Sequence, residues 1–358
     1  MTRPLTFQAS DRLMVFAPHP DDETIATGEL IQLARDSGAA VRVVFATDGD
    51  NNPWPQRWCE RRLRIGPADR ARWGQRRRGE AEAALARLGI AADAVRFLGW
   101  PDLGVTGKLE HDDAAIDALR DEIAAWAPTH VAMPSLRDRH PDHGAFRVML
   151  ELALSKARSN AARLGYVVHG RDSDDDLLHL ALDSARHARK REALMAHASQ
   201  ISLSKSRLLR WADQPEAFER SEAGGSIAGG SRGGIVLSLP LAPAFRYWRR
   251  HDVLLVIANG ERIERARVPL PRFAGGSARV ALGRALCAGR VAVELDGGML
   301  QISIAGDAEG HVHGYVKLDR TMPRVVIFDV ETWQRVGDFS ASQAPSVEPM
   351  PVAHRASL

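Results

Sequence analysis

The sequence predicts an α/β protein: a Rossmann-like, mostly parallel sheet with helices on both faces, followed by a small all-β, sandwich-like domain. Two observations support this prediction. Up to about residue 200, short apolar runs alternate with stretches of helical periodicity, as expected for parallel strands joined by helical crossovers. After a Gly-rich stretch at residues 223–234, the chain changes to short apolar or alternating runs bounded by Gly and Pro, which is typical of antiparallel sheets.

Each element of the α/β part is predicted by its own pattern. Residues 12–17, RLMVFA, are an apolar run that prolines end, and residues 40–49 are a second run that ends at Asp and Gly. Between them, residues 22–38 carry apolar side chains at near-helical spacing and stop at Gly38. In chain order, the other predicted elements are a helix at 77–90, a strand at 94–100, a helix at 114–128 and a strand at 130–135.

These patterns divide the chain into four parts. We expect an α/β domain over residues 1–222, a Gly-rich linker over 223–234, a β-rich accessory domain over 235–345 and a disordered tail over 346–358. A chain of 358 residues, 45% of them hydrophobic, is long enough for two domains. The accessory domain could bind glycan, mediate assembly or brace the α/β domain, and its sequence does not choose among these roles.

Cysteine content and hydropathy narrow the class of protein. Cys59 and Cys287 lie far apart in the sequence, so neither a disulfide framework nor a thiolate zinc site is expected. Any metal has to be held by His and carboxylates. The N-terminal apolar run is too short for a signal peptide, and no stretch approaches a membrane span. The cytoplasm is therefore the expected location.

The net charge of +3 and the pI near 9.1 come mostly from arginine. This mild excess of positive charge is compatible with an anionic ligand. An arginine-rich composition also follows from genome base composition, which we take as the main cause of the overall figure. No nucleic-acid partner is predicted, and the sequence does not indicate an oligomeric state.

Residues that can bind metals follow the predicted strands, where each strand ends. His19, Asp21 and Asp22 follow the first strand, Asp102 follows the third, and the run HPDH at 140–143 follows the fourth. Parallel strands have their carboxyl ends at one edge of the sheet, and ligands of such sheets collect there. We therefore expect a functional site at this edge.

The spacing of three of these residues predicts a catalytic metal site. His19 and Asp22 are three positions apart at the start of a helix and can turn toward one point, and His143 can meet them from the neighbouring strand end. Three protein ligands with one position left open for water are the arrangement of a catalytic Zn2+, although two His and one Asp can also hold Fe2+. Asp21 is not needed as a ligand and is the predicted general base.

Four motifs resemble the PIG-L (LmbE-like) family of zinc-dependent N-deacetylases. They are PHPDDE after the first strand, HPDH after a later strand, RRGEAEAALARLG between them and KREALMAHASQ at residues 190–200. The resemblance covers roughly residues 10–205. It implies a hydrolase that removes acetyl from an N-acetylated amino sugar, such as an N-acetylglucosamine glycoconjugate, and releases acetate. Just before HPDH, this chain has Asp138 and Arg139 where some sugar-thiol deacetylases of the family have a tyrosine, which weakens assignment to that branch.

The resemblance also implies roles for individual residues. His19, Asp22 and His143 match the metal ligands of the family, and Asp21 matches its general base. His140 matches the residue that stabilises the tetrahedral intermediate or protonates the leaving amine. A protonated imidazole could do either.

Three further residues have looser expected roles. Asp142 is expected to orient a histidine, and its alternative role is to cap the helix that follows. Arg77 and Asp102 fall where family members contact the sugar. The alternative for Arg77 is an ion pair with Glu80 on the same helix.

Residues 51–78 are the part of this region with the most distinctive composition, because Trp54 and Trp58 stand among many arginines. The segment leaves the end of the second strand, so we expect it beside the metal site, where loops carry specificity. Trp faces suit sugar rings, and Arg suits phosphate or carboxylate. We predict that it recognises an anionic glycan or glycoconjugate, such as a nucleotide sugar or a phosphorylated cell-surface saccharide. The alternative is a basic solvated loop whose tryptophans pack against the sheet.

Two other functions stay open. The protein could be a glycan-binding protein with a non-catalytic metal site, or the same centre could hydrolyse another amide or an ester. The presence of a general base, Asp21, and of a histidine that is not a predicted metal ligand, His140, favours an enzyme. A structural metal site needs neither residue.

Overall fold

The structure of the protein is a computed structural model. It describes residues 5–170, 177–221, 227–229, 235–240, 251–259, 262–270, 277–281, 290–296, 299–304, 310–320, 328–329 and 331–335. The chain divides into two compact units. The first comprises Met1–Gly224 and Val326–Trp333, and the second comprises Gly225–Val325 and Gln334–Leu358. The predicted linker lies largely outside the described residues, and the predicted tail lies wholly outside them.

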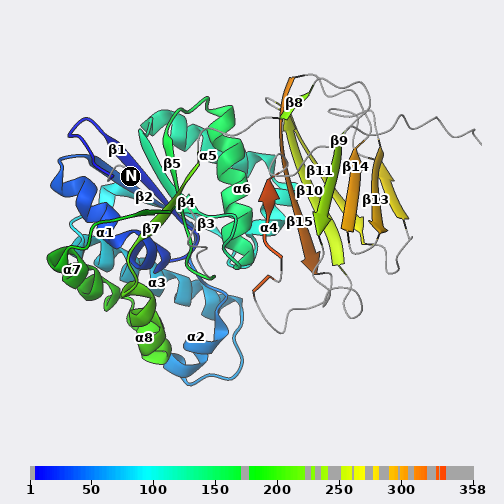
Figure 1. The fold of residues 1–358 in the computed structure, drawn as a ribbon. Coiled ribbons are helices and arrows are strands. Elements are labelled where there is room, and N and C mark those ends of the chain that lie inside the picture. The colour runs from blue at the N-terminus through cyan, green and yellow to red at the C-terminus, as the bar shows by residue number, and fades with distance from the viewer. Residues whose placement is uncertain are drawn as a thin grey trace, which may run out of the picture. The chain divides into compact units, whose positions relative to one another are not determined.

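Strands and helices alternate through most of the first unit (Figure 1). Its strands are β1 (Arg12–Ala17), β2 (Ala40–Thr47), β3 (Val95–Trp100), β4 (His130–Pro134), β5 (Ala162–Tyr166), β6 (Leu177–His179) and β7 (Ala217–Ser221). Its helices are α1 (Asp22–Asp36), α2 (Pro53–Glu60), α3 (Pro67–Arg87), the short 3-10 helix η1 (Ala92–Ala94), α4 (Val105–His111), α5 (Asp113–Trp126), α6 (Pro141–Lys156), α7 (Ser184–Leu194) and α8 (Ala198–Ala212).

A seven-stranded sheet with the order β3-β2-β1-β4-β5-β7-β6 forms the centre of the first unit. The pairs from β3 to β5 are parallel, whereas β7 runs antiparallel to β5 and β6. This mostly parallel sheet confirms the predicted fold class. The chain order reverses between β1 and β4, and in such sheets the crevice outside the strand ends at the reversal is where ligands bind.

Helices lie on both faces of this sheet (Figure 1). One group consists of α1, α3, α7 and α8, which contact one another, and a second consists of α4, α5 and α6. The central strand β1 is buried from Leu13 to Ala17, because helices cover it on both sides. That is why its sequence is a continuous apolar run rather than an alternating one.

The first predicted helix is found at nearly the expected residues. It begins at Asp22 and ends at Asp36, and Gly38 follows with φ of 80°. Glycine adopts this left-handed conformation at little cost, so a glycine at this position predicts the end of a helix. The second strand ends at Thr47, two positions earlier than predicted, because the chain then turns toward the site.

Residues 51–78 do not form the basic loop that was the alternative reading of this segment. They contain α2 and the first half of α3, which starts at Pro67 rather than at residue 77. Pro53 and Pro67 occupy the first helical position, where the missing N–H of proline is not needed. Asp69 Oδ2 accepts the Gly66 N–H at 3.0 Å at the start of α3. Arginine also favours helix, so a charge-rich segment folded as helix rather than loop.

The second unit contains two antiparallel sheets within its described residues. Their strands are β8 (Ile227–Gly229), β9 (Ile235–Pro240), β10 (His251–Asn259), β11 (Arg262–Pro269), β12 (Ser277–Ala281), β13 (Arg290–Asp296), β14 (Met299–Ile304), β15 (Gly310–Arg320) and β16 (Gln334–Arg335). One sheet has the order β11-β10-β15-β16 with β8 also paired to β15, and the other has the order β12-β13-β14-β9. Residues 326–333, which the sequence assigned to the β-rich domain, belong to the first unit.

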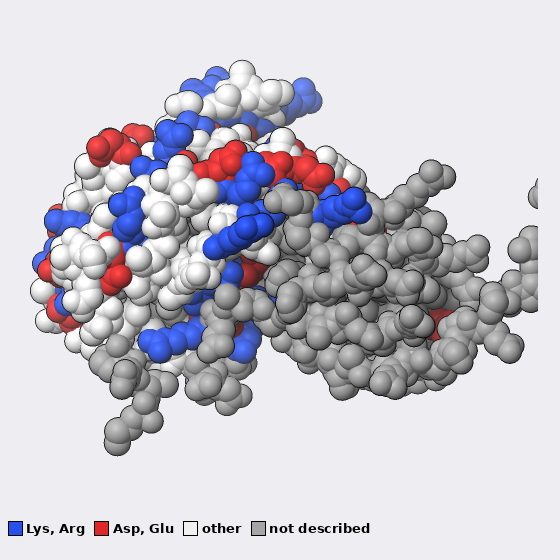
Figure 2. Space-filling model, turned by 90° about the horizontal axis from the view of Figure 1, so that it is seen from above, with Lys and Arg blue, Asp and Glu red and all other residues white. Residues whose placement is uncertain are grey.

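The described surface carries charges of both signs. Figure 2 shows basic and acidic side chains interspersed on one face of the molecule, so the small net positive charge is not gathered there. Interspersed charges are typical of a solvated surface. Among the described helices, none combines the length and the apolar character needed to span a bilayer.

Candidate metal centre and active site

Two strand-to-helix connections bring the predicted site residues together at the carboxyl edge of the sheet. The connection from β1 to α1 carries His19 and Asp21, and α1 begins at Asp22. The connection from β4 to α6 carries His140, and His143 lies in the first turn of α6. Because β1 and β4 are paired neighbours, residues far apart in the sequence meet where the strand order reverses.

Three donor atoms form a compact triangle at this place. Asp22 Oδ2 lies 3.2 Å from His19 Nδ1 and 3.1 Å from His143 Nε2, and the two nitrogens are 3.3 Å apart. Ligands at about 2.0–2.1 Å from a tetrahedral zinc ion are about 3.3 Å from each other. All three side chains are buried. The predicted ligand set therefore has the size and the donor types that a small divalent ion requires.

The charge balance at the triangle also suits a cation. Burial alone would raise the pKa of Asp22, but His143 and His19 outweigh it and hold that pKa well below its usual value. Burial would lower the pKa of His143, yet Asp138 and Asp22 raise it to about 9. The carboxylates thus hold protons on the imidazoles, and a divalent ion that replaces those protons is stabilised by the same carboxylates.

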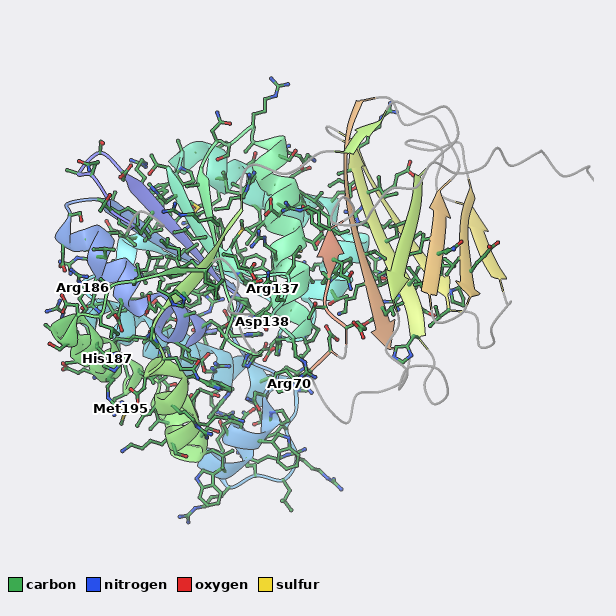
Figure 3. The ribbon with its side chains drawn as sticks, viewed as in Figure 1. Arg70, Arg137, Asp138, Arg186, His187 and Met195 are labelled. Carbon is green, nitrogen blue, oxygen red and sulfur yellow. The ribbon has the colours of Figure 1, made fainter. Side chains whose placement is uncertain are left out.

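Asp138 orients His143. Its Oδ2 atom lies 3.0 Å from His143 Nδ1 and also accepts the N–H groups of Val168 and His169. Figure 3 labels Asp138 in the interior of the first unit, near α6. A proton on Nδ1 that is donated to Asp138 leaves Nε2 of His143 free to bind a metal. Sequence reasoning placed Asp138 among the polar residues that follow the fourth strand, but it assigned Asp138 no role at the metal and missed this contact.

The outer nitrogen of His19 faces two other carboxylates. His19 Nε2 lies 3.2 Å from Asp102 Oδ1 and 3.4 Å from Asp142 Oδ2. Burial would lower the pKa of His19, but Asp102 and the other two carboxylates outweigh it and raise the pKa well above its usual value. A proton on Nε2 leaves Nδ1 as the metal-facing atom. Asp102, which was expected at the sugar, is thus in direct contact with His19.

Asp142 contacts His19 and also holds the start of α4. Its carboxylate accepts the N–H of Leu103 at 2.6 Å and the N–H of Val105 at 3.2 Å. The alternative role as the cap of α6 is not found, because the capping residue is His140. Asp142 therefore fixes both a histidine and a neighbouring helix.

Asp21 lies beside the triangle in a strained backbone conformation. Its φ is 118°, a value that residues with a side chain rarely adopt and that is enriched at functional sites. The Asp21 N–H donates to Glu23 Oε2 at 2.9 Å, and Arg77 Nη2 donates to its carboxylate at 3.3 Å. Burial raises the pKa of Asp21 to about 6, although Arg77 opposes the shift.

Arg77 is buried and holds the carboxylate of Asp21 in place. Besides Asp21, it donates to the carbonyl oxygens of Gly49, at 2.9 Å, and Pro20. The alternative ion pair with Glu80 is not formed, because Glu80 pairs with Arg76 at 3.0 Å. Arg77 reaches the pocket from the middle of α3, but the carbonyl and carboxylate groups of its own chain occupy both terminal nitrogens.

His140 is the N-cap of α6, and its Nδ1 accepts the Asp142 N–H at 3.3 Å. Burial lowers the pKa of His140 well below its usual value, and the neighbouring His19 and His143 lower it further. This differs from the protonated imidazole that was expected. With Nδ1 as an acceptor, a neutral His140 carries its proton on Nε2. His140 also has a ligand atom within 4.8 Å of those of His19 and His143.

Three aromatic residues that sequence reasoning missed join the site. His169 follows β5, and its ring centroid lies 5.0 Å from that of His143 and 5.4 Å from that of His140. Burial lowers the pKa of His169 to about 4. The rings of Trp211 and Phe328 lie 5.2 Å and 5.1 Å from the ring of His169. His169 follows β5, a strand that was not predicted from the sequence, so its position at the strand end could not be read there. Trp211 and Phe328 had no local signal.

Phe328 is held at the site by contacts within the first unit. The Asp329 N–H donates to the carbonyl of Arg139 at 2.8 Å, and Arg139 Nε donates to the carbonyl of Asp329 at 3.1 Å. Trp333 packs on Gly144 so closely that a methyl group there would lie 2.7 Å from Trp333 Cδ1. A segment 190 positions later in the chain thus packs against the start of α6.

The site opens into a pocket of about 370 Å³, near the lower end of the range for small-molecule sites. Of the predicted residues, the pocket is lined by His19, Asp21, Asp22, Trp54, Arg77, Asp102 and His140. His143 and Asp142 lie behind this lining and have no exposed surface. Trp58 is outside the lining, so only one of the two tryptophans expected to contact substrate reaches the pocket.

Comparison with known proteins identifies the family. Residues 14–154 match the family model of PIG-L, described as GlcNAc-PI de-N-acetylase. A 1D-myo-inositol 2-acetamido-2-deoxy-alpha-D-glucopyranoside deacetylase of Mycolicibacterium gilvum is 30% identical over 241 residues, which cover 54% of this chain and 81% of that protein. The chain belongs to the PIG-L family. This confirms the family predicted from the motifs. A protein of the same description from Tsukamurella paurometabola is 31% identical over 199 residues, covering 46% of this chain and 64% of that protein.

Two solved structures also resemble part of this PIG-L family chain. N,N'-diacetylchitobiose deacetylase from Pyrococcus horikoshii has 18% identity and a TM-score of 0.46, and the match covers 60% of this chain and 85% of that chain. A conserved protein from Thermus thermophilus has 22% identity and a TM-score of 0.45, with 61% and 98% covered.

Proposed function

We propose that the protein is a metal-dependent hydrolase that removes the N-acetyl group from an amino sugar of the N-acetylglucosamine type and releases acetate. The observation that carries this proposal is the donor triangle of His19, Asp22 and His143, with Asp21 and His140 beside it at a pocket. Membership of the PIG-L family supports the same reaction, since the relative matched over most of its length is named as a deacetylase of a 2-acetamido-2-deoxy-glucopyranoside.

Zinc is the metal that the donor set favours. Two imidazole nitrogens and one carboxylate oxygen at tetrahedral separations are typical of catalytic zinc, and Fe2+ is the alternative that the same donors accept. When bound, such an ion would act as a Lewis acid that polarises the amide carbonyl, and it would lower the pKa of a water molecule at the site. His19, Asp22 and His143 would hold it, with Asp102, Asp142 and Asp138 orienting the two imidazoles.

Asp21 is the proposed general base. It lines the pocket and contributes none of the three atoms of the triangle. A pKa of about 6 leaves its carboxylate ionised at neutral pH while increasing its affinity for a proton taken from water. Contacts with Arg77 and Glu23 hold Asp21 in place, so the base is oriented before substrate binds.

His140 is the proposed hydrogen-bond donor to the carbonyl oxygen. Its Nδ1 is used by the Asp142 N–H, so Nε2 is the atom that can donate. A neutral imidazole that donates a hydrogen bond through Nε2 stabilises the developing oxyanion and keeps its proton. The proton that Asp21 takes from water is delivered to the leaving amine as the C–N bond breaks, which regenerates the Asp21 carboxylate. The other expected role of His140, protonating the amine, would require the protonated ring.

The pocket supports a small sugar headgroup as the substrate. A volume of about 370 Å³ suits one or two rings rather than a buried polymer. Trp54 offers an exposed aromatic face at the pocket, which suits a sugar ring. We propose that the glycoconjugate is anionic, because the segment that presents Trp54 is rich in arginine. The cytoplasmic location and the lack of a nucleic-acid partner stay predictions.

The two alternative functions are less well supported. A glycan-binding protein with a structural metal needs neither a strained carboxylate such as Asp21 nor a donor such as His140 beside the metal ligands. Hydrolysis of another amide or of an ester would use the same residues and differ only in the acyl group.

Acetate release by the purified full-length protein, with zinc added, tests the proposed function. N-acetylglucosamine glycoconjugates, nucleotide sugars and lipopolysaccharide fragments are the substrates to screen. Asp21→Ala is expected to abolish release while the bound metal stays at the wild-type level, because Asp21 is not part of the triangle. Unchanged release by Asp21→Ala would contradict its role as base. A protein that binds glycan and metal but releases no acetate would support the binding function instead.

A further inference from the structure

We propose that the protein docks on anionic lipid bilayers through one surface, which we call the α2 face. This surface consists of Trp54 and Trp58 of α2 and of Arg61, Leu63 and Arg64 in the connection to α3. The proposal concerns binding to a surface and stands without the proposed reaction. Figure 1 shows α2 and this connection at the lower end of the first unit.

The α2 face exposes large apolar side chains that proteins normally bury. Trp54 and Trp58 are four positions apart in a helix, so they lie on the same side of it. They are 65% and 64% exposed, and Leu63 is 88% exposed. Exposed apolar groups of this size within one short segment, residues 54–63, are typical of an interaction site. Tryptophan in particular suits a membrane interface, because its ring is apolar and its N–H is polar.

Positive charge surrounds these apolar groups. Residues 51–66 contain a single acid, Glu60, and four arginines: Arg57, Arg61, Arg62 and Arg64. Glu60 pairs with Arg72, and Arg62 pairs with Asp69 at 2.8 Å. Within the described part of the chain, Arg61 and Arg64 have no ion-pair partner. The face seen in Figure 2, by contrast, has charges of both signs.

The α2 face is preformed rather than part of a loose loop. Pro55 and Gln56 on the inner side of α2 are buried, and Gln56 Nε2 donates to the carbonyl of Asp69 at 2.7 Å. Cys59 Sγ lies 3.1 Å from Ser202 Oγ of α8. With its inner side held in this way, α2 cannot turn its tryptophans inward without losing these contacts. The apolar exposure is therefore a lasting property of the folded chain.

The α2 face continues into the rim of the pocket. Trp54 belongs to both, and Leu103, Leu203 and Phe328 are further partly exposed apolar residues that line the pocket. A bilayer in contact with α2 would therefore lie beside the mouth of the pocket.

An anionic bilayer fits the α2 face better than other occupants do. Two copies meeting through the same face would bring like charges together. A soluble anionic polysaccharide would pair with Arg61 and Arg64 but leave Leu63 in water. A bilayer interface accepts the apolar side chains, and each arginine near an anionic surface strengthens binding about fivefold. It is the occupant that accounts for both the charge and the apolar exposure.

Vesicle flotation of the full-length protein tests this proposal. We expect binding to vesicles of phosphatidylcholine mixed with phosphatidylglycerol and little binding to phosphatidylcholine alone. Trp58→Ala combined with Leu63→Ser is expected to weaken binding about tenfold or more, and Arg61→Gln with Arg64→Gln about 25-fold, as for two arginines. High salt should weaken binding of the wild type, because the arginine contribution is screened.

Matched variants make the result specific to the α2 face. Leu182→Ser removes a leucine that is 80% exposed elsewhere, and Arg96→Gln removes an exposed arginine of β3; both should bind as the wild type does. Thermal unfolding would show that each variant is folded. No binding to phosphatidylglycerol vesicles, or equal loss with Leu182→Ser, would overturn the proposal, as would binding to a soluble anionic polysaccharide without binding to vesicles. Acetate release from a soluble substrate, measured on the same variants, reports on the proposed reaction separately.

Discussion

The metal centre and the α2 face depart from the usual distribution of residues in opposite ways. At the centre, Asp22 and His143 are charged or ionisable groups with at most 1% of their surface exposed, and at the α2 face Leu63 is 88% exposed. Burying charge and exposing large apolar groups both cost free energy. Each departure is explained by the ligand that we propose there, a divalent cation in one region and an apolar, anionic surface in the other. Buried ionisable groups therefore indicate an ionic ligand, and exposed apolar groups indicate a partner with an apolar surface.

The strongest way to break the metal centre is to remove His143. His143→Ala leaves two of three ligands and takes the imidazole partner from Asp22 and Asp138. We expect loss of the bound metal and a fall in activity of about 10³-fold or more. Metal content by elemental analysis and acetate release measure this. His187→Ala, which changes a histidine of α7 labelled in Figure 3, is the control. Full metal content in His143→Ala would show that the triangle is not the metal site.

A smaller loss is expected when only the orientation of His143 is changed. Asp138→Asn keeps the size of the side chain but removes the charge that holds His143 Nδ1 at 3.0 Å. We expect metal affinity to fall about 10- to 100-fold, as measured by competition with a chelator. Affinity equal to that of the wild type would mean that Asp138 supports the fold and not the metal.

The pH dependence of activity reports on Asp21. A general base has to be ionised, so activity falls as the pH drops below its pKa. Burial raises that pKa to about 6, and a bound cation would lower it again, because positive charge favours the carboxylate. We therefore expect the acid limb of kcat/KM at or below about pH 6. An acid limb above neutral pH would assign the base to another group.

The two exposed tryptophans separate the pocket from the α2 face. Trp54 lines the pocket and Trp58 does not. With a soluble substrate, Trp54→Ala is expected to raise KM about tenfold, whereas Trp58→Ala should change it less than about twofold. Steady-state kinetics of the two variants are the measurement, and each serves as the control for the other. An equal effect of both would place Trp58 at the substrate.

The smallest expected effect is at Phe328. Its ring lines the pocket beside His140 and His169, while neighbouring residues anchor its segment. Phe328→Ala is expected to raise KM about threefold with kcat nearly unchanged, because it removes apolar contact area but no reacting group. Thermal unfolding controls for stability. A large fall in kcat at unchanged KM would give Phe328 a closer role in the reaction.

Much of the fold and of the site could be predicted because the signals are local. The start of α1 follows from an acid-rich turn after an apolar strand, and its end follows from Gly38. His19 and Asp22 share a turn, so their convergence follows from helix geometry. The helices within residues 51–78 were not predicted, because periodic apolar residues are sparse there and the prolines read as loop signals, although they begin the helices.

By itself, the sequence determined the strand and helix alternation, the family motifs and the types of residue at the site, since each depends on residues near one another in the chain. Only the tertiary structure decided which carboxylate faces which imidazole nitrogen. Asp138 rather than Asp142 holds His143, and Asp102 contacts His19 from the end of another strand. It also brought Phe328 to His169 and left Trp58 outside the pocket. Strand order and helix packing set these contacts, and no local pattern of residues encodes them.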